Sequence, residues 1–234
     1  MKFLKFFPCF SIINQMISTG LQKLDKFLSG GIPSGAITDI YGANGTGKTQ
    51  LLLQISINVI KNGGNILYLD TTGGFRPERI LEMQKNQNLE INILDKITVS
   101  RITNTFEQIN SIKNIKQGKF SLVVIDNITD LFSYEYKSEE SIFKKNSLFM
   151  KYIHDLSLIA INNNIPIVIT NMIRNIDDKD VENMRKAIDL FTHIKIKLSK
   201  NSSKYHGEVN WLLNNYSFSY VINASGLSEY SEDF

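Results

Sequence analysis

Residues 42–49 read GANGTGKT, and residue types at this spacing can hold the phosphates of a nucleotide. Glycines let backbone N–H groups curl around phosphate oxygens, and a helix that begins there adds the positive end of its dipole. The ammonium of Lys48 would reach the β- and γ-phosphates, and the hydroxyl of Thr49 would bind Mg²⁺. The pattern therefore predicts a site for ATP with Mg²⁺. The residues that we expect to contact the nucleotide from this segment are Gly42, Ala43, Asn44, Gly45, Thr46, Gly47, Lys48, Thr49 and Gln50.

A second motif lies downstream of the glycine-rich segment, where Asp126 ends the apolar run that begins at Leu122. A residue at the carboxyl end of a parallel strand lies at the edge of the sheet where ligands bind. A carboxylate at that edge can hold the Mg²⁺ of a bound nucleotide. We therefore predict Thr49 and Asp126 as metal ligands and Lys48 and Asp126 as catalytic residues. A glycine-rich turn that matches the first pattern by chance is the alternative, and the second motif counts against it.

These residues need strands and helices to position them, and the sequence alternates the two. Leu51, Ile55 and Val59 recur at helical spacing after the glycine-rich segment, and Pro77 suits the first turn of another helix. A long helix is expected at about 141–162, and strands with turns replace helices after His193. The other strands that we expect lie at residues 35–41, 66–70, 97–99, 122–126 and 165–170. This order predicts an α/β fold with a mostly parallel central sheet flanked by helices and a C-terminal β-hairpin region.

The bulk properties are those of an ordinary globular protein. The chain has 234 residues, 42% hydrophobic and 21% charged, with a net charge of +3. Its one cysteine, Cys9, excludes a disulfide framework and favours a cytoplasmic location, and we expect no membrane span. The first apolar residues lack a signal-peptide cleavage pattern, so we treat 1–15 as an N-terminal extension before a translation start that could be Met16.

Three segments resemble the RecA-type ATPase core of the archaeal RadA and RadB recombinases. They are Ile17–Asp25 followed by Gly30–Gly35, then Asp70–Ile80, which reads DTTGGFRPERI, and finally the pair Thr170-Asn171. The resemblance covers roughly residues 16–228 and leaves 229–234 as a tail. It implies a RecA-like P-loop NTPase core that binds ATP at a subunit interface. The chain lacks the helical N-terminal domain of RadA and is small, which favours a RadB-like paralogue in homologous recombination and DNA repair.

The resemblance also implies roles for individual residues. Arg79 would stack on the adenine, and Asp70 would lie near the phosphates. The family carries Glu where this chain has Thr72, and it carries Gln where this chain has Met172. A threonine hydroxyl is a very poor general base and a thioether is a weak acceptor, so we expect ATP hydrolysis to be slow or absent. Asp70 is the candidate for a substitute catalytic base.

The segments that correspond to DNA-contacting loops are acidic here. Glu135, Glu139 and Glu140 lie in the first, and Asp177, Asp178, Asp180 and Glu182 lie in the second. Acidic loops repel the phosphate backbone, so we expect single-stranded DNA to bind weakly if at all. Lys195 and Lys197 share one face of an expected strand, which is either a solvated face or a nucleic-acid contact.

The expected partners are a RadA-like recombinase or further copies of this chain. Two alternatives remain open at this stage. One is a KaiC-like signalling ATPase, which a pair of adjacent catalytic glutamates would support, and Glu139-Glu140 comes too late in the chain for that role. The other is a nucleotide-gated scaffold that does not bind DNA, which the acidic loops would favour.

Overall fold

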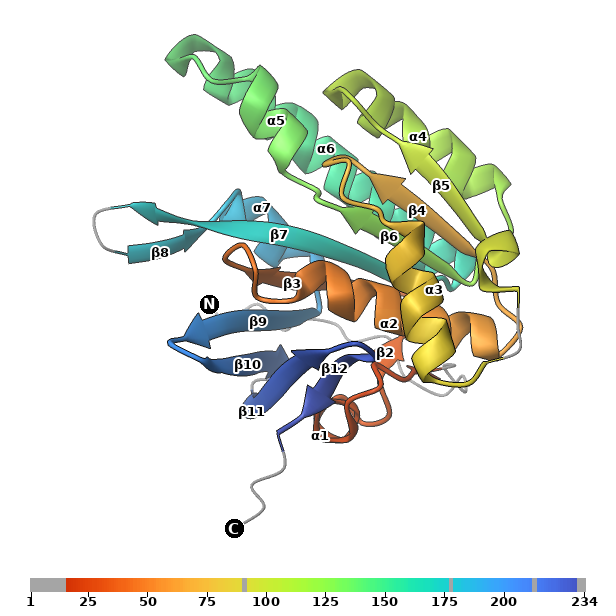
Figure 1. Ribbon diagram of the computed structural model, residues 1–234. Helices are drawn as coiled ribbons and strands as arrows, with labels where there is room; N and C mark the ends of the chain where they lie inside the picture. Colours follow the sequence, from red (N-terminus) through yellow and green to blue (C-terminus); the bar gives the residue numbers. More distant parts are fainter. Residues whose placement is uncertain (1–15, 90–91, 177–178, 212–213, 231–234) are drawn as a thin grey trace.

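The computed structural model describes residues 16–89, 92–176, 179–211 and 214–230 (Figure 1). The expected N-terminal extension, the end of the C-terminal tail at 231–234, and Asp177 and Asp178 lie outside these ranges. Within them, no helix is both long and apolar enough to cross a membrane.

A large twisted sheet forms the centre of the molecule. Its strands run in the order β12-β11-β10-β9-β3-β7-β6-β4-β5. The six strands β5, β4, β6, β7, β3 and β9 are parallel to one another, and β10, β11 and β12 continue the sheet with antiparallel pairings. In chain order the strands are β3 (Ile37–Gly42), β4 (Ile66–Asp70), β5 (Ile97–Arg101), β6 (Leu122–Asp126), β7 (Ile167–Ile176), β9 (Ile194–Asn201), β10 (Lys204–Trp211), β11 (Asn214–Asn223) and β12 (Gly226–Glu229). Strands β4 and β6 are buried at every position, as continuous apolar runs in a covered parallel sheet should be.

Two short pairings complete the strands. The antiparallel strand β8 (Lys179–Glu182) folds back on the far end of β7, so the two form a hairpin that projects from the sheet (Figure 1). Strands β1 (Met16–Ile17) and β2 (Ile32–Pro33) form a separate two-stranded sheet at the start of the described chain.

Helices cover both faces of the large sheet and create two hydrophobic cores. One core contains residues of α1 (Gln22–Phe27), α2 (Lys48–Lys61) and α3 (Pro77–Asn86). The other contains residues of α4 (Thr105–Gln117), α5 (Asp130–Glu135), α6 (Glu139–Asn163) and α7 (Arg185–Phe191). A 3₁₀ turn, η1 (Ile93–Lys96), precedes β5. Figure 1 shows α4, α5 and α6 together on one side of the strands.

The expected α/β fold with a mostly parallel sheet is confirmed, and the differences are local. Helices α5 and α7 were not predicted, because six and seven residues are too few to show helical periodicity. The C-terminal region holds four strands rather than a single hairpin, and its first strand, β9, joins the main sheet parallel to β3.

Candidate functional site

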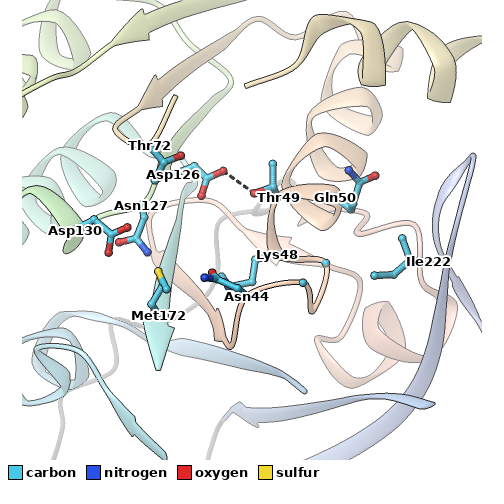
Figure 2. Close-up of a pocket in the computed structure, with 12 residues that line it drawn as sticks. Asn44, Lys48, Thr49, Gln50, Thr72, Asp126, Asn127, Asp130, Met172 and Ile222 are labelled. Carbon is cyan, nitrogen blue, oxygen red and sulfur yellow. Dashed lines mark hydrogen bonds between the residues drawn. The ribbon is translucent and has the colours of Figure 1, made fainter. Parts of the chain in front are cut away.

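A pocket of about 500 Å³ opens at the carboxyl edge of the parallel strands. This is the edge at which α/β sheets bind ligands, and the volume lies in the range of small-molecule sites. Figure 2 shows the side chains that converge on the pocket. The lining residues are Asn44, Gly45, Gly47, Lys48, Thr49, Gln50, Thr72, Asp126, Asn127, Asp130, Met172 and Ile222.

The glycine-rich segment joins β3 to α2, as its sequence predicts. Gly45 and Gly47 have φ angles of 76° and 93°, in a left-handed region that side chains rarely adopt. The Lys48 ammonium donates hydrogen bonds to the carbonyls of Gly42 and Ala43 at 2.9 and 2.8 Å. Partial burial lowers the pKa of Lys48, while the carboxylates of Asp126 and Asp130 act to raise it.

The expected nucleotide contacts divide into two groups. Asn44, Gly45, Gly47 and the run Lys48–Gln50 line the pocket. The other expected contacts, Gly42, Ala43, Thr46 and Arg79, are not among the lining residues, and their contact with a nucleotide stays a prediction. Thr46 is buried, and its hydroxyl donates to the Ala43 carbonyl at 2.9 Å, so it shapes the loop from within.

Thr49 and Asp126 meet at the centre of the pocket. The Thr49 hydroxyl donates to Oδ2 of Asp126 at 2.9 Å, and the Tyr68 hydroxyl donates to the same oxygen at 2.8 Å. Thr170 donates to the other carboxylate oxygen. Burial, followed by the charge of Asp126, raises the pKa of Tyr68, so this hydroxyl stays a donor. A hydroxyl and a carboxylate at this separation form a donor set that suits Mg²⁺, which takes its remaining oxygens from water and phosphate.

Asp70 ends β4 beside Asp126, and its carboxylate is already occupied. Oδ1 accepts hydrogen bonds from the backbone N–H groups of Thr72, Gly73 and Gly74, and Oδ2 accepts one from Phe75. Asp70 is 4% exposed and is not among the residues that line the pocket. The carboxylate therefore holds the turn after β4 in shape. Its role as a substitute base stays a prediction, and this geometry does not favour it.

Thr72 and Met172 both line the pocket, at the positions where the resemblance placed Glu and Gln. Met172 follows Asn171, whose side chain bonds to Thr129 at 2.7 Å and donates to Glu182 at 3.1 Å. The strand that carries Met172 is thus held to the residue that precedes α5 and to β8. Neither Thr72 nor Met172 offers a group that takes a proton from water at neutral pH.

The opposite end of the pocket is closed by the C-terminal strands. Arg79 donates through Nε to Gln50 at 2.7 Å, and its other nitrogens donate to the carbonyls of Asn223 and Ala224 in the turn between β11 and β12. Ile222 of β11 lines the pocket next to this group. Arg79 also forms an ion pair with Glu82, and stacking of its guanidinium on a base stays a prediction.

Several residues of the site were not predicted from the sequence. Asp130 at the start of α5 and Asn127 lie on the same wall as Thr72, and Ile222 comes from the C-terminal strands. The Tyr220 hydroxyl donates to the Thr46 carbonyl and so supports the phosphate loop from below. The spacing of Tyr220 and Ile222 indicates one face of a strand, but nothing in it indicates contact with residues 46 and 47.

The basic face expected on β9 is only partly available to a ligand. Lys195 forms ion pairs with Glu182, with Asp189 at 2.6 Å and with Asp39 at 3.7 Å, and 14% of its side chain is exposed. Burial acts to lower the pKa of Lys195, but these carboxylates raise it overall. Glu182 is buried as well, so it is not a surface charge as its segment suggested. Of the expected pair, Lys197 is left as the candidate for a nucleic-acid contact.

Comparison with known proteins identifies related sequences. The family model described as Rad51 matches residues 11–191. The DNA repair and recombination protein RadB of Pyrococcus furiosus is 34% identical over 163 residues, which cover 68% of each chain. RadB of Thermococcus sibiricus is 35% identical over 162 residues, again 68% of each chain. The DNA repair and recombination protein RadA of Cenarchaeum symbiosum is 33% identical over 174 residues, which cover 70% of this chain and 44% of that protein. The match therefore spans less than half of RadA.

Proposed function

Because this chain belongs to the Rad51 family within the RecA/RadA superfamily, we propose that it is a RadB-like recombinase paralogue that binds ATP and assists homologous recombination and DNA repair. In this role it would bind a RadA-like recombinase or further copies of itself. Its ATP turnover would be slow, and its own grip on single-stranded DNA would be weak.

The observation that carries the ATP-binding proposal is the pairing of the phosphate loop with Asp126. Lys48 and Thr49 open α2, and Thr49 lies 2.9 Å from the carboxylate of Asp126 inside the same pocket. Thr49 and Asp126 would hold Mg²⁺, which neutralises phosphate charge when it is bound. Phosphate oxygens would compete with the carbonyls of Gly42 and Ala43 for the Lys48 ammonium.

The slow-turnover proposal rests on Thr72 and Met172. Both line the pocket, and neither can take a proton from an attacking water. Loss of a general base commonly lowers a rate by about 10²- to 10⁴-fold. A protein that keeps ATP bound without cleaving it quickly suits an accessory factor, because bound nucleotide can then hold one conformation for a long time.

Single-turnover cleavage of ATP, with protein in excess and with or without single-stranded DNA, tests this proposal. Equilibrium dialysis with a non-hydrolysable ATP analogue is run beside it, and Lys48→Ala serves as the binding control. We expect bound nucleotide, slow product formation and little effect of DNA. Fast cleavage that DNA stimulates would contradict slow turnover, and absence of analogue binding would contradict the ATP site itself.

A nucleotide-gated scaffold without DNA contact is the second candidate. The ion pairs of Lys195 favour it, because they remove one of the three lysines of β9, Lys195, Lys197 and Lys200, from contact with DNA. Binding to labelled single-stranded DNA at two salt concentrations separates the candidates, since phosphate contacts weaken steeply as salt rises. The Rad51 family match gives no support to a KaiC-like signalling ATPase.

A further inference from the structure

The proposed function leaves one chemical question open, which is what takes the proton when ATP is cleaved slowly. Among the described residues, three carboxylates lie at this edge of the sheet: Asp70, Asp126 and Asp130. Asp70 accepts hydrogen bonds from four backbone N–H groups and is not among the residues that line the pocket. Asp126 accepts hydrogen bonds from the hydroxyl groups of Thr49, Tyr68 and Thr170, and it is already proposed as a ligand of Mg²⁺.

Asp130 differs from both other carboxylates. It lines the pocket, and no hydrogen bond or ion pair with any residue of the described ranges occupies its carboxylate. Figure 2 shows Asp130 on the side where Thr72 and Met172 lie, with Asn127 beside it and with Lys48 and Asn44 on the other side. The carboxylate therefore lines the same pocket as the two positions at which the family's water-orienting groups are replaced.

The surroundings of Asp130 suit a base. Partial burial raises the pKa of its carboxyl, Arg174 and Lys48 act to lower it, and Asp126 acts to raise it. A carboxylate with a raised pKa accepts a proton more readily at neutral pH than an exposed aspartate does. The influence of Lys48 also places Asp130 within electrostatic range of the residue that would hold the γ-phosphate.

We propose that Asp130 is the general base of the residual ATPase reaction, a role that rests on the proposed ATP site. The carboxylate would accept a hydrogen bond from a water beside the γ-phosphate and take its proton as the water oxygen attacks. The new P–O bond forms while the bond between the γ-phosphorus and the bridging oxygen breaks, and ADP leaves with that electron pair. The proton then passes from Asp130 to solvent as phosphate departs.

The test compares wild type with Asp130→Asn, which keeps the shape of the side chain and removes the base. Single-turnover cleavage should fall by about 10²-fold or more. Affinity for a non-hydrolysable ATP analogue should stay within about threefold, because the lost group does not hold the ground state. Affinity for ADP with aluminium fluoride, which mimics the transition state, should fall with the cleavage rate. Asp95→Asn, an exposed aspartate of η1 outside the pocket, is the matched control and should change none of these values.

A second variant distinguishes loss of the base from loss of the fold. Thr72→Glu restores the family's carboxylate from the neighbouring wall, so Thr72→Glu combined with Asp130→Asn should cleave ATP faster than Asp130→Asn alone. The wild-type rate should rise with pH along an acidic limb that disappears in Asp130→Asn.

Other results of the same experiments would contradict the proposal. Cleavage by Asp130→Asn within about threefold of wild type would overturn the role of Asp130, and so would a wild-type protein that binds the analogue but cleaves no ATP. Tighter analogue binding with unchanged cleavage would show that Asp130 only repels phosphate, which also overturns the role. A wild-type protein that fails to bind the analogue would instead overturn the ATP site.

Discussion

Replacing Lys195 with methionine should destabilise the folded protein by about 3–5 kcal/mol at pH 8 and by less at pH 6. Asp39 is fully buried, and neither of its carboxylate oxygens has a hydrogen-bond partner within the described chain, so the ammonium of Lys195 is the group that stabilises its ionised form. Glu182 is buried against the same ammonium. Removing one partner from a buried ion pair commonly costs about 3–5 kcal/mol, and only 14% of the Lys195 side chain is exposed.

The pH dependence follows from the carboxyl that remains. Burial raises the pKa of Asp39 well above 3.8, repulsion from Glu182 raises it further, and Lys195 acts to lower it. The folded protein therefore holds a proton that the unfolded chain has released, so stability falls as pH rises from about 3.8 toward the folded pKa. Lys195→Met removes the influence that lowers this pKa and so widens that window. Protonation of the buried carboxyl becomes easier as pH falls, which gives the smaller loss at pH 6.

Urea denaturation at both pH values measures these differences, and Lys197→Met is the matched control. Lys197 lies two residues along β9 and forms no ion pair with any described residue, so its loss should cost under about 0.5 kcal/mol. Asp39→Asn should recover part of the stability of Lys195→Met, because it removes the charge left unpaired. The explanation is wrong if Lys195→Met costs no more than the control, or if its cost is the same at pH 6 and pH 8.

Three further substitutions test the contact with phosphate, the contact with adenine and the packing of the phosphate loop. Lys48→Ala should lower ATP affinity by about 10- to 100-fold in equilibrium dialysis, since it removes a charged donor to phosphate. Arg79→Ala should weaken ATP binding by about tenfold and leave tripolyphosphate binding unchanged, if the guanidinium stacks on the base. Gly42→Ala should lower the melting temperature by about 5 °C, because the added Cβ would lie 2.0 Å from the Leu198 carbonyl oxygen and would push β3 and β9 apart.

The parts of the site that the sequence predicted are those that a local pattern determines. The phosphate loop needs its glycines, its lysine and its threonine within eight residues, and a strand and a helix on either side are visible as apolar runs. Asp126 was predictable because a buried parallel strand ends at the ligand-binding edge whatever the order of strands in the sheet. In both cases the residues that matter are neighbours in the chain.

The Lys195 cluster shows why the rest could not be predicted. Alternation along a strand correctly predicts that Lys195 and Lys197 share a face, but it does not reveal what lies opposite. Asp39 comes from β3, far earlier in the chain, and it meets Lys195 only because β9 pairs parallel to β3 in this register. The same lysine could face solvent or DNA under a different strand order. The ion cluster is therefore a consequence of topology, which composition and spacing do not specify.

Asp130 is close to a predicted residue in the chain, but its position in the pocket depends on the fold. It begins α5, only four residues after Asp126 ends β6, but α5 has too few residues for periodicity to indicate which way its first side chain points. Only the folded chain places it in the same pocket as Thr72, which follows β4, and Met172, which lies within β7. Catalytic groups in a parallel sheet can be exchanged between strand ends, because those ends meet at one edge. A carboxylate lost at Thr72 can thus be replaced from another segment, so the departure from the family pattern at one position does not by itself establish loss of the chemistry.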